Sequence, residues 1–209
     1  MIKKIHTGGI VYIQPLDGTD EWYWGTDYIS GDLYEAEELF RDGHRIDRNR
    51  LIFVHYPDGL VVEPVTAQEG QYFGLPAYED GQILILLADF AAGEIRVLSY
   101  KEEVETVQVL PLSEIEDCYN LMLHGSPVCL TRQTADRFQM IWPDRADFAI
   151  APQETFCWRD GDRLYFSRWY EDPDYREETV VRQMPDGSVL EQYPGSPAIM
   201  PGGRKWVLI

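Results

Sequence analysis

The sequence has no long apolar segment. Its longest apolar run, Ile83–Ala88, is six residues long, whereas a helix that crosses a bilayer needs roughly 20. Near the N-terminus, His6, Gly8 and Gly9 interrupt the apolar residues that follow two lysines, so we expect no signal peptide. The predicted location is cytoplasmic, without contact to a membrane.

Basic residues are scarce. The chain has 18 Lys and Arg against 36 Asp and Glu, which gives a formal net charge of −18. Nucleic acids and anionic membranes attract basic surfaces, so both are excluded as expected partners. An acidic surface attracts a basic protein, and sequestering such a partner is therefore one alternative function.

Cysteines and catalytic motifs are also few. Cys118, Cys129 and Cys157 are an odd number without C-x-x-C spacing, which is typical of free core thiols rather than of disulfides or a zinc site. The sequence contains no phosphate loop, no dinucleotide fingerprint, no H-E-x-x-H or G-x-S-x-G motif and no calcium loop. We therefore predict no cofactor, no metal and no catalytic residue.

Strand patterns dominate what is present. Hydrophobic residues make up 44% and aromatics 13% of the chain, enough for a globular core. Segments rich in β-branched and aromatic residues include Arg50–Tyr56, Gly93–Tyr100 and Arg163–Trp169. Turn signals such as Pro57–Gly59 and Pro185–Gly187 separate them. The pattern predicts an all-β protein.

The turns recur at intervals that indicate repeated units of four strands. A repeat of about 40–50 residues is typical of a β-propeller blade. The predicted fold is a single domain, residues 1–209, forming a small closed five-bladed propeller. Its blades are expected at residues 20–66, 67–113, 114–153, 154–195, and 196–209 together with 1–19.

The two ends of the chain suggest how this ring closes. Ile5–Val11 resembles Val54–Val61, so the N-terminus is expected to complete the blade that begins at Pro197. This predicts pairing of Trp206–Ile209 with Ile2–Thr7 or Ile10–Ile13, which removes exposed edges. The alternative is an irregular β-sandwich with a short helix near residues 32–42.

Two segments carry more specific predictions. Residues 32–43 start with a capping Asp32, contain helix formers and end at Gly43, so they are either an inserted helix or a strand imposed by the fold. Ile83–Leu87 is expected to be a strand with both faces buried, Leu84 and Leu86 on one side.

The candidate site lies in the loops that lead into the innermost strands. In four units an acid stands shortly before an aromatic residue, and such a pair suits a sugar or an organic cation. The predicted ligand-binding residues are Trp22, Trp24, Tyr72, Tyr119 and Trp158, with Glu21, Glu69, Asp117 and Glu154 at the rim. In the competing interpretation the acids are solvated and the rings fill the core.

These observations favour a non-catalytic binding or interaction module. The expected partner is a small polar molecule or a basic protein. The alternative is a glycosidase-type enzyme with carboxylates in the channel, for which the candidates are Asp27, Asp80, Asp160 and Asp162. Among the histidines, His124 precedes Gly125 beside an inner turn, and the sequence contains no motif that assigns it a role.

Overall fold

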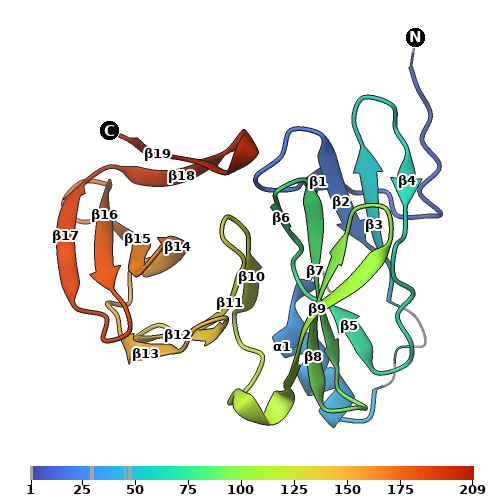
Figure 1. Cartoon of the computed structure of the whole chain (residues 1–209), viewed down its shortest axis with the longest axis horizontal. Helices are drawn as coiled ribbons and strands as arrows, with labels where there is room; N and C mark the ends of the chain where they lie inside the picture. Colours follow the sequence, from blue (N-terminus) through green and yellow to red (C-terminus); the bar gives the residue numbers. More distant parts are fainter. Residues whose placement is uncertain (1, 29–30, 45, 47–48) are drawn as a thin grey trace.

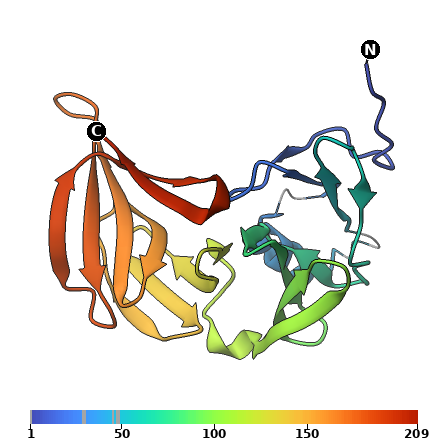
Figure 2. The ribbon, with the colours of Figure 1, turned by 45° about the horizontal axis from the view of Figure 1, so that its top comes forward.

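The structure is a computed structural model that describes residues 2–28, 31–44, 46 and 49–209. Four antiparallel sheets stand around a common axis in a ring that resembles a four-bladed β-propeller (Figures 1 and 2). A two-stranded hairpin follows the fourth sheet, and one short α-helix is inserted in the first. In the described part of the chain, no helix has the length and apolar character to span a membrane.

Each sheet is formed by consecutive strands. Sheet 1 contains β1 (Gln14–Pro15), β2 (Trp22–Thr26), β3 (Leu51–His55) and β4 (Val61–Val62), with α1 (Leu33–Arg41) between β2 and β3. Sheet 2 contains β5 (Gln71–Phe73), β6 (Ala77–Glu79), β7 (Gln82–Asp89), β8 (Glu94–Tyr100) and β9 (Val104–Pro111), and β7 pairs with both β5 and β6.

The second half of the chain continues this order. Sheet 3 contains β10 (Leu121–His124), β11 (Cys129–Gln133), β12 (Arg137–Trp142) and β13 (Ala146–Ala149). Sheet 4 contains β14 (Glu154–Asp160), β15 (Arg163–Tyr170), β16 (Arg176–Gln183) and β17 (Val189–Pro194). The C-terminal hairpin is β18 (Ser196–Met200) and β19 (Arg204–Leu208), and short 3-10 turns lie at Leu112–Glu114 and Pro201–Gly203.

Three apolar cores hold neighbouring sheets together. Phe53 and Trp24 of sheet 1 pack with Ile85 of sheet 2, and Leu86 on the other face of β7 packs in the core shared with sheet 3. A third core joins sheets 3 and 4 around Phe138, which contacts several other phenylalanines. Burial of this apolar surface is the main force that fixes the ring.

The junction between sheet 4 and sheet 1 is built differently from the other three. The C-terminal hairpin leaves sheet 4 and reaches sheet 1 across the ring (Figure 2). Near its base, the Gly195 amide donates to the Glu177 carbonyl at 3.0 Å. At its tip, the Gly202 amide donates to the Gly18 carbonyl at 3.0 Å. A hairpin tip, rather than an extended intersheet core, therefore spans this gap.

The prediction of five blades is not confirmed, and the predicted closure is wrong. Among the described residues β19 pairs with β18 and with no other strand. The N-terminal segment instead packs on sheet 1, where Ile10 joins Ile52 and Val54 in a small core. The sequence similarity between Ile5–Val11 and Val54–Val61 did not decide where the N-terminal segment packs, because that depends on tertiary contacts that local patterns do not contain.

The prediction for Ile83–Leu87 is confirmed. Strand β7 is buried on both faces, with Leu84 4% and Leu86 0% exposed. Its odd-numbered side chains face sheet 1 and its even-numbered ones face sheet 3. The strand thus separates two cores, which explains its unbroken apolar sequence.

The open question about residues 32–43 is resolved as a helix. The Asp32 carboxylate accepts hydrogen bonds from the backbone amides of Tyr34 and Glu35, which caps the first turn of α1. Leu33 and Ala36 are buried against sheet 2, so one face of the helix extends the core instead of replacing a strand.

Candidate functional site

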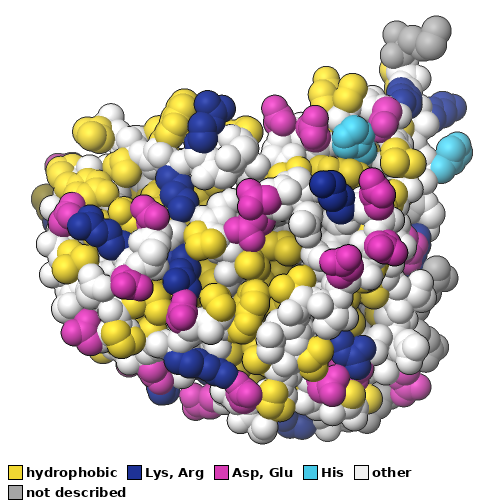
Figure 3. Space-filling view, viewed as in Figure 1, with side chains coloured by type: hydrophobic (Ala, Val, Ile, Leu, Met, Phe, Trp, Pro, Cys, Tyr) yellow, Lys and Arg dark blue, Asp and Glu magenta, His cyan; other side chains and the backbone are white. Residues whose placement is uncertain are grey.

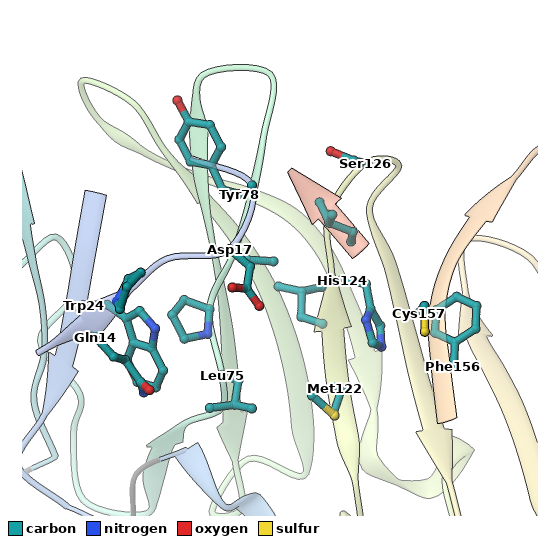
Figure 4. A pocket seen from close by; sticks show the side chains of 17 residues that line it. Gln14, Asp17, Trp24, Leu75, Tyr78, Met122, His124, Ser126, Phe156 and Cys157 are labelled. Atoms are coloured by element: carbon teal, nitrogen blue, oxygen red, sulfur yellow. The ribbon is translucent and has the colours of Figure 1, made fainter. Parts of the chain in front are cut away.

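The innermost strands of the four sheets and the C-terminal hairpin line a depression on the ring axis, hereafter the axial depression (Figure 4). Its volume is about 380 Å³, within the usual range of small-molecule sites. Apolar side chains gather near the middle of the face in Figure 3, with acidic side chains scattered around them. The lining residues used below are Gln14, Asp17, Trp24, Leu75, Tyr78, Met122, His124, Ser126, Phe156, Cys157 and Ile199.

Apolar side chains form much of the wall. Trp24 from β2 lies on one side and Phe156 from β14 on the other, with Leu75 and Met122 between them (Figure 4). Ile199 from the hairpin belongs to the same lining. Contact area of this kind supplies most of the binding energy in small-molecule sites.

Four polar side chains of the lining have no internal partner. Gln14, Asp17, Tyr78 and Ser126 make no side-chain hydrogen bond or ion pair within the described part of the chain. Asp17 is exposed, and its carboxylate extends into the depression between Trp24 and His124 (Figure 4). The ring of Tyr78 points away from the depression in Figure 4, so Gln14, Asp17 and Ser126 are the groups available to a ligand.

The turn that carries Ser126 is held in place by the neighbouring sheet. Glu79 at the end of β6 accepts hydrogen bonds from the Ser126 amide at 3.1 Å and the Val128 amide at 2.9 Å. Burial raises the pKa of Glu79, and these two hydrogen bonds oppose that effect. Gly125 lies against the backbone of Tyr78, where any Cβ would collide. The glycine is therefore required for the close approach of sheets 2 and 3.

His124 is placed by contacts on two sides. Its Nε2 lies 2.9 Å from Thr131 Oγ1, and its ring meets Phe156 edge-on with centroids 4.9 Å apart. Burial lowers the pKa of His124 to about 4, so the imidazole is neutral at neutral pH. His124 therefore contributes a polar but uncharged side chain to the wall of the depression.

The structure separates the five aromatic residues that the sequence placed at one site. Trp24 lines the axial depression, whereas Tyr72 is fully buried in the core between sheets 2 and 3. Trp158 is buried against Tyr165 with ring centroids 5.3 Å apart. The other two also lie outside the depression: Trp22 packs against His55 and the exposed Tyr119 against Tyr34.

The four predicted rim acids are also dispersed. Glu154 is 1% exposed and lies between Arg168 and Arg182, to both of which it is ion-paired. Asp117 accepts a hydrogen bond from Arg132 Nε at 2.9 Å. Glu21 and Glu69 are exposed, and neither lines the depression. The acids that stand before aromatic residues therefore differ in environment from one repeat to the next: some are paired with arginine and others are exposed.

Sequence reasoning missed most of the residues that do line the depression. Asp17 lies in the Asp17–Gly18 turn, and this turn signal was available in the sequence. No turn signal marks Gln14, Met122 or Phe156. They lie on three separate innermost strands, which come together only when the four sheets pack around one axis.

The candidate glycosidase carboxylates lie elsewhere. Asp80, Asp160 and Asp162 belong to or border hairpin turns, and Asp27 accepts a hydrogen bond from the Arg50 amide at 2.8 Å. Among the described lining residues Asp17 is the only carboxylate. The paired carboxylates that glycoside hydrolysis uses are therefore not assembled there. The described residues also contain no group of three or more His, Cys, Asp or Glu able to hold a metal ion.

The sequence matches no protein-family model and no curated protein. Among solved structures, it is similar to a puromycin-hydrolyzing peptidase from Mycobacterium tuberculosis, with 16% sequence identity and a TM-score of 0.43. The similarity covers 94% of this chain and 33% of that one, so the chain spans about a third of the peptidase's length. The chain is a ring of four β-sheets that resembles a β-propeller, with the axial depression as its candidate functional site.

Proposed function

We propose that this protein is a non-catalytic binding module whose ligand is a small polar molecule held in the axial depression. The observation that carries the proposal is the combination of an apolar wall with three unpartnered polar side chains. The parts of Trp24 and Phe156 that reach the surface, 6% of each residue, offer apolar contact, while Gln14, Asp17 and Ser126 offer hydrogen bonds that fix orientation.

The same residues argue against nucleophilic catalysis. Asp17, His124 and Ser126 all line the depression, but the one side-chain hydrogen bond of His124 within the described residues goes to Thr131. A Ser–His pair requires the imidazole to bond the hydroxyl, with a third group orienting the ring. That arrangement is missing from the described lining, so these groups are better suited to holding a ligand.

The proposal is tested by filling the depression. Isothermal titration calorimetry would screen the whole protein against monosaccharides, amino acids, polyamines and quaternary ammonium compounds. Met122→Trp places a large ring in the lining, and Val107→Trp, at an exposed position of β9, is the matched control.

We expect at least one class of compound to bind the native protein and the Val107→Trp variant with equal affinity, and Met122→Trp to weaken that binding tenfold or more. Circular dichroism would confirm that both variants are folded. Absence of binding by every class, or equal affinity in both variants, would overturn the proposal.

A further inference from the structure

The axial depression has an unbalanced charge. Asp17 is the only lining residue with a formal charge among those described, and no Lys or Arg belongs to the lining. His124 does not supply a positive charge, because burial lowers its pKa and keeps the imidazole neutral at neutral pH. A ligand in the depression therefore meets one carboxylate and no fixed cation.

The surroundings do not reverse this charge. Behind Ser126 lies the carboxylate of Glu79, and Lys205 of the hairpin acts on it electrostatically. The ammonium of Lys205 donates to the Arg159 carbonyl at 3.0 Å, outside the lining. The chain as a whole carries a formal charge of −18, which draws cations toward its surface.

Aromatic rings complete the environment that a cation prefers. Trp24 and Phe156 stand on opposite sides of the depression, with the Asp17 carboxylate between Trp24 and His124 (Figure 4). An aromatic ring attracts a nearby cation, as the carboxylate does, and the part of Trp24 that reaches the surface, 6% of the residue, lies at this wall. Leu75 and Met122 offer an apolar surface to the carbon skeleton of such a ligand.

We infer that the ligand of the axial depression is a small organic cation, an alkylammonium compound whose charged nitrogen lies against Asp17 and Trp24. This inference rests on the proposed function, since it names the chemical class of the molecule bound at the same site. Neutral sugars, which suit the same wall of rings and hydroxyls, are the class that it excludes.

The test compares two ligands of one shape. Choline and 3,3-dimethylbutan-1-ol differ in having nitrogen or carbon at the branched centre, so only choline carries a charge. Titration calorimetry at low and at physiological salt would measure both, together with a primary alkylamine and glucose. Asp17→Asn removes the charge from the depression, and Asp20→Asn, at an exposed position outside the lining, is the matched control.

We expect choline or the primary amine to bind at least tenfold more tightly than the neutral alcohol and glucose. Asp17→Asn should lower that affinity at least tenfold, while Asp20→Asn leaves it unchanged. Melting temperatures of both variants should equal that of the native protein, because Asp17 has no partner within the described residues.

The possible failures are distinguishable. The inference of a cationic ligand would be wrong if the alcohol and choline bound equally, if glucose bound more tightly, or if the two substitutions had equal effects. Each of these results would leave the proposed binding function standing. If none of the four compounds bound, the inference of a cationic ligand would also be wrong. The broader screen with Met122→Trp would then test the proposed function itself.

Discussion

The backbone amide of Gly202 donates a hydrogen bond to the carbonyl oxygen of Gly18 at 3.0 Å. This bond joins the tip of the C-terminal hairpin to the turn that precedes β2, although the two residues lie near opposite ends of the chain. The tip also approaches Ser126 of sheet 3 through Gly203. Three distant segments therefore meet at one edge of the axial depression, to which Gly18, Ser126 and Ile199 all contribute.

The two tip glycines offer a matched pair of substitutions. Both have positive φ, +74° at Gly202 and +68° at Gly203, so alanine at either position should cost about 1–2 kcal/mol in backbone strain. A Cβ at Gly203 would lie 2.7 Å from Ser126 Oγ, whereas one at Gly202 meets nothing within 4 Å. Calorimetry should show a larger loss of thermal stability for Gly203→Ala. Equal losses would contradict the close approach of Gly203 to Ser126.

The core strand β7 provides a second prediction. Leu86 is 0% exposed between sheets 2 and 3, so Leu86→Ala should lower the free energy of unfolding by about 2–5 kcal/mol. Val107→Ala on the exposed edge strand β9 is the control, with an expected change within about 0.5 kcal/mol. Urea unfolding measures both. A small loss at Leu86 would show that the strand is not a shared core element.

The buried ion pairs of Glu154 provide a third prediction. Glu154→Gln removes the charge that compensates Arg168 and Arg182, and such a loss typically costs about 3–5 kcal/mol. The exposed pair of Arg163 with Glu191 is the comparison, since Glu191→Gln should cost less than about 1 kcal/mol. Chemical unfolding at pH 7 distinguishes them, and similar small losses would indicate that water reaches Glu154.

His124 makes stability depend on pH. Burial lowers its pKa from 6.5 to about 4 in the folded protein, so between these values the unfolded chain binds the additional proton. Stability contributed by the neutral imidazole is therefore fully present above pH 6.5 and decreases as the pH falls toward 4. Because each pH unit between the unfolded and folded pKa corresponds to about 1.4 kcal/mol, the total loss amounts to roughly 3 kcal/mol.

The pH effect is isolated with His124→Gln, whose amide can still bond Thr131 but does not titrate in this range. Unfolding free energies of both proteins would be measured from pH 7.5 to pH 5, above the range in which most carboxyl groups titrate. The native protein should lose stability more steeply than the variant below pH 6.5. If the unfolding free energies of the two proteins changed in parallel with pH, solvent would have to reach the imidazole ring of His124.

Several elements were predictable because their causes are local. The strand at Ile83–Leu87 follows from an apolar run too short for a long helix. For residues 32–43 the capping Asp32 and the spacing of Leu33 and Ala36 left helix or strand open, and the structure shows the helix α1. Closure of the ring was not predictable in this way, because the local pattern of the N-terminal segment does not say which sheet it covers, and only packing decided that Ile10 covers sheet 1.

The candidate site shows the same division. Its prediction depended on an acid beside an aromatic in each repeat, yet Glu154 became a buried ion-pair partner and Tyr72 a core residue. A side chain's neighbours depend on the twist and spacing of several sheets, and a displacement by one residue reverses the face on which it points. Trp24 alone of the nine predicted residues reached the axial depression.

By itself, the amino-acid sequence determined that this chain is all-β, acidic and built from repeated strand–turn units, since composition, period-two patterns and turn residues act over a few positions. The tertiary structure decided the number of sheets, the hairpin that bridges the fourth junction and the residues that meet on the axis. Gln14, Asp17, Met122 and Phe156 become neighbours only when the sheets pack, because contacts between residues far apart in the chain form only once shared apolar surfaces are buried.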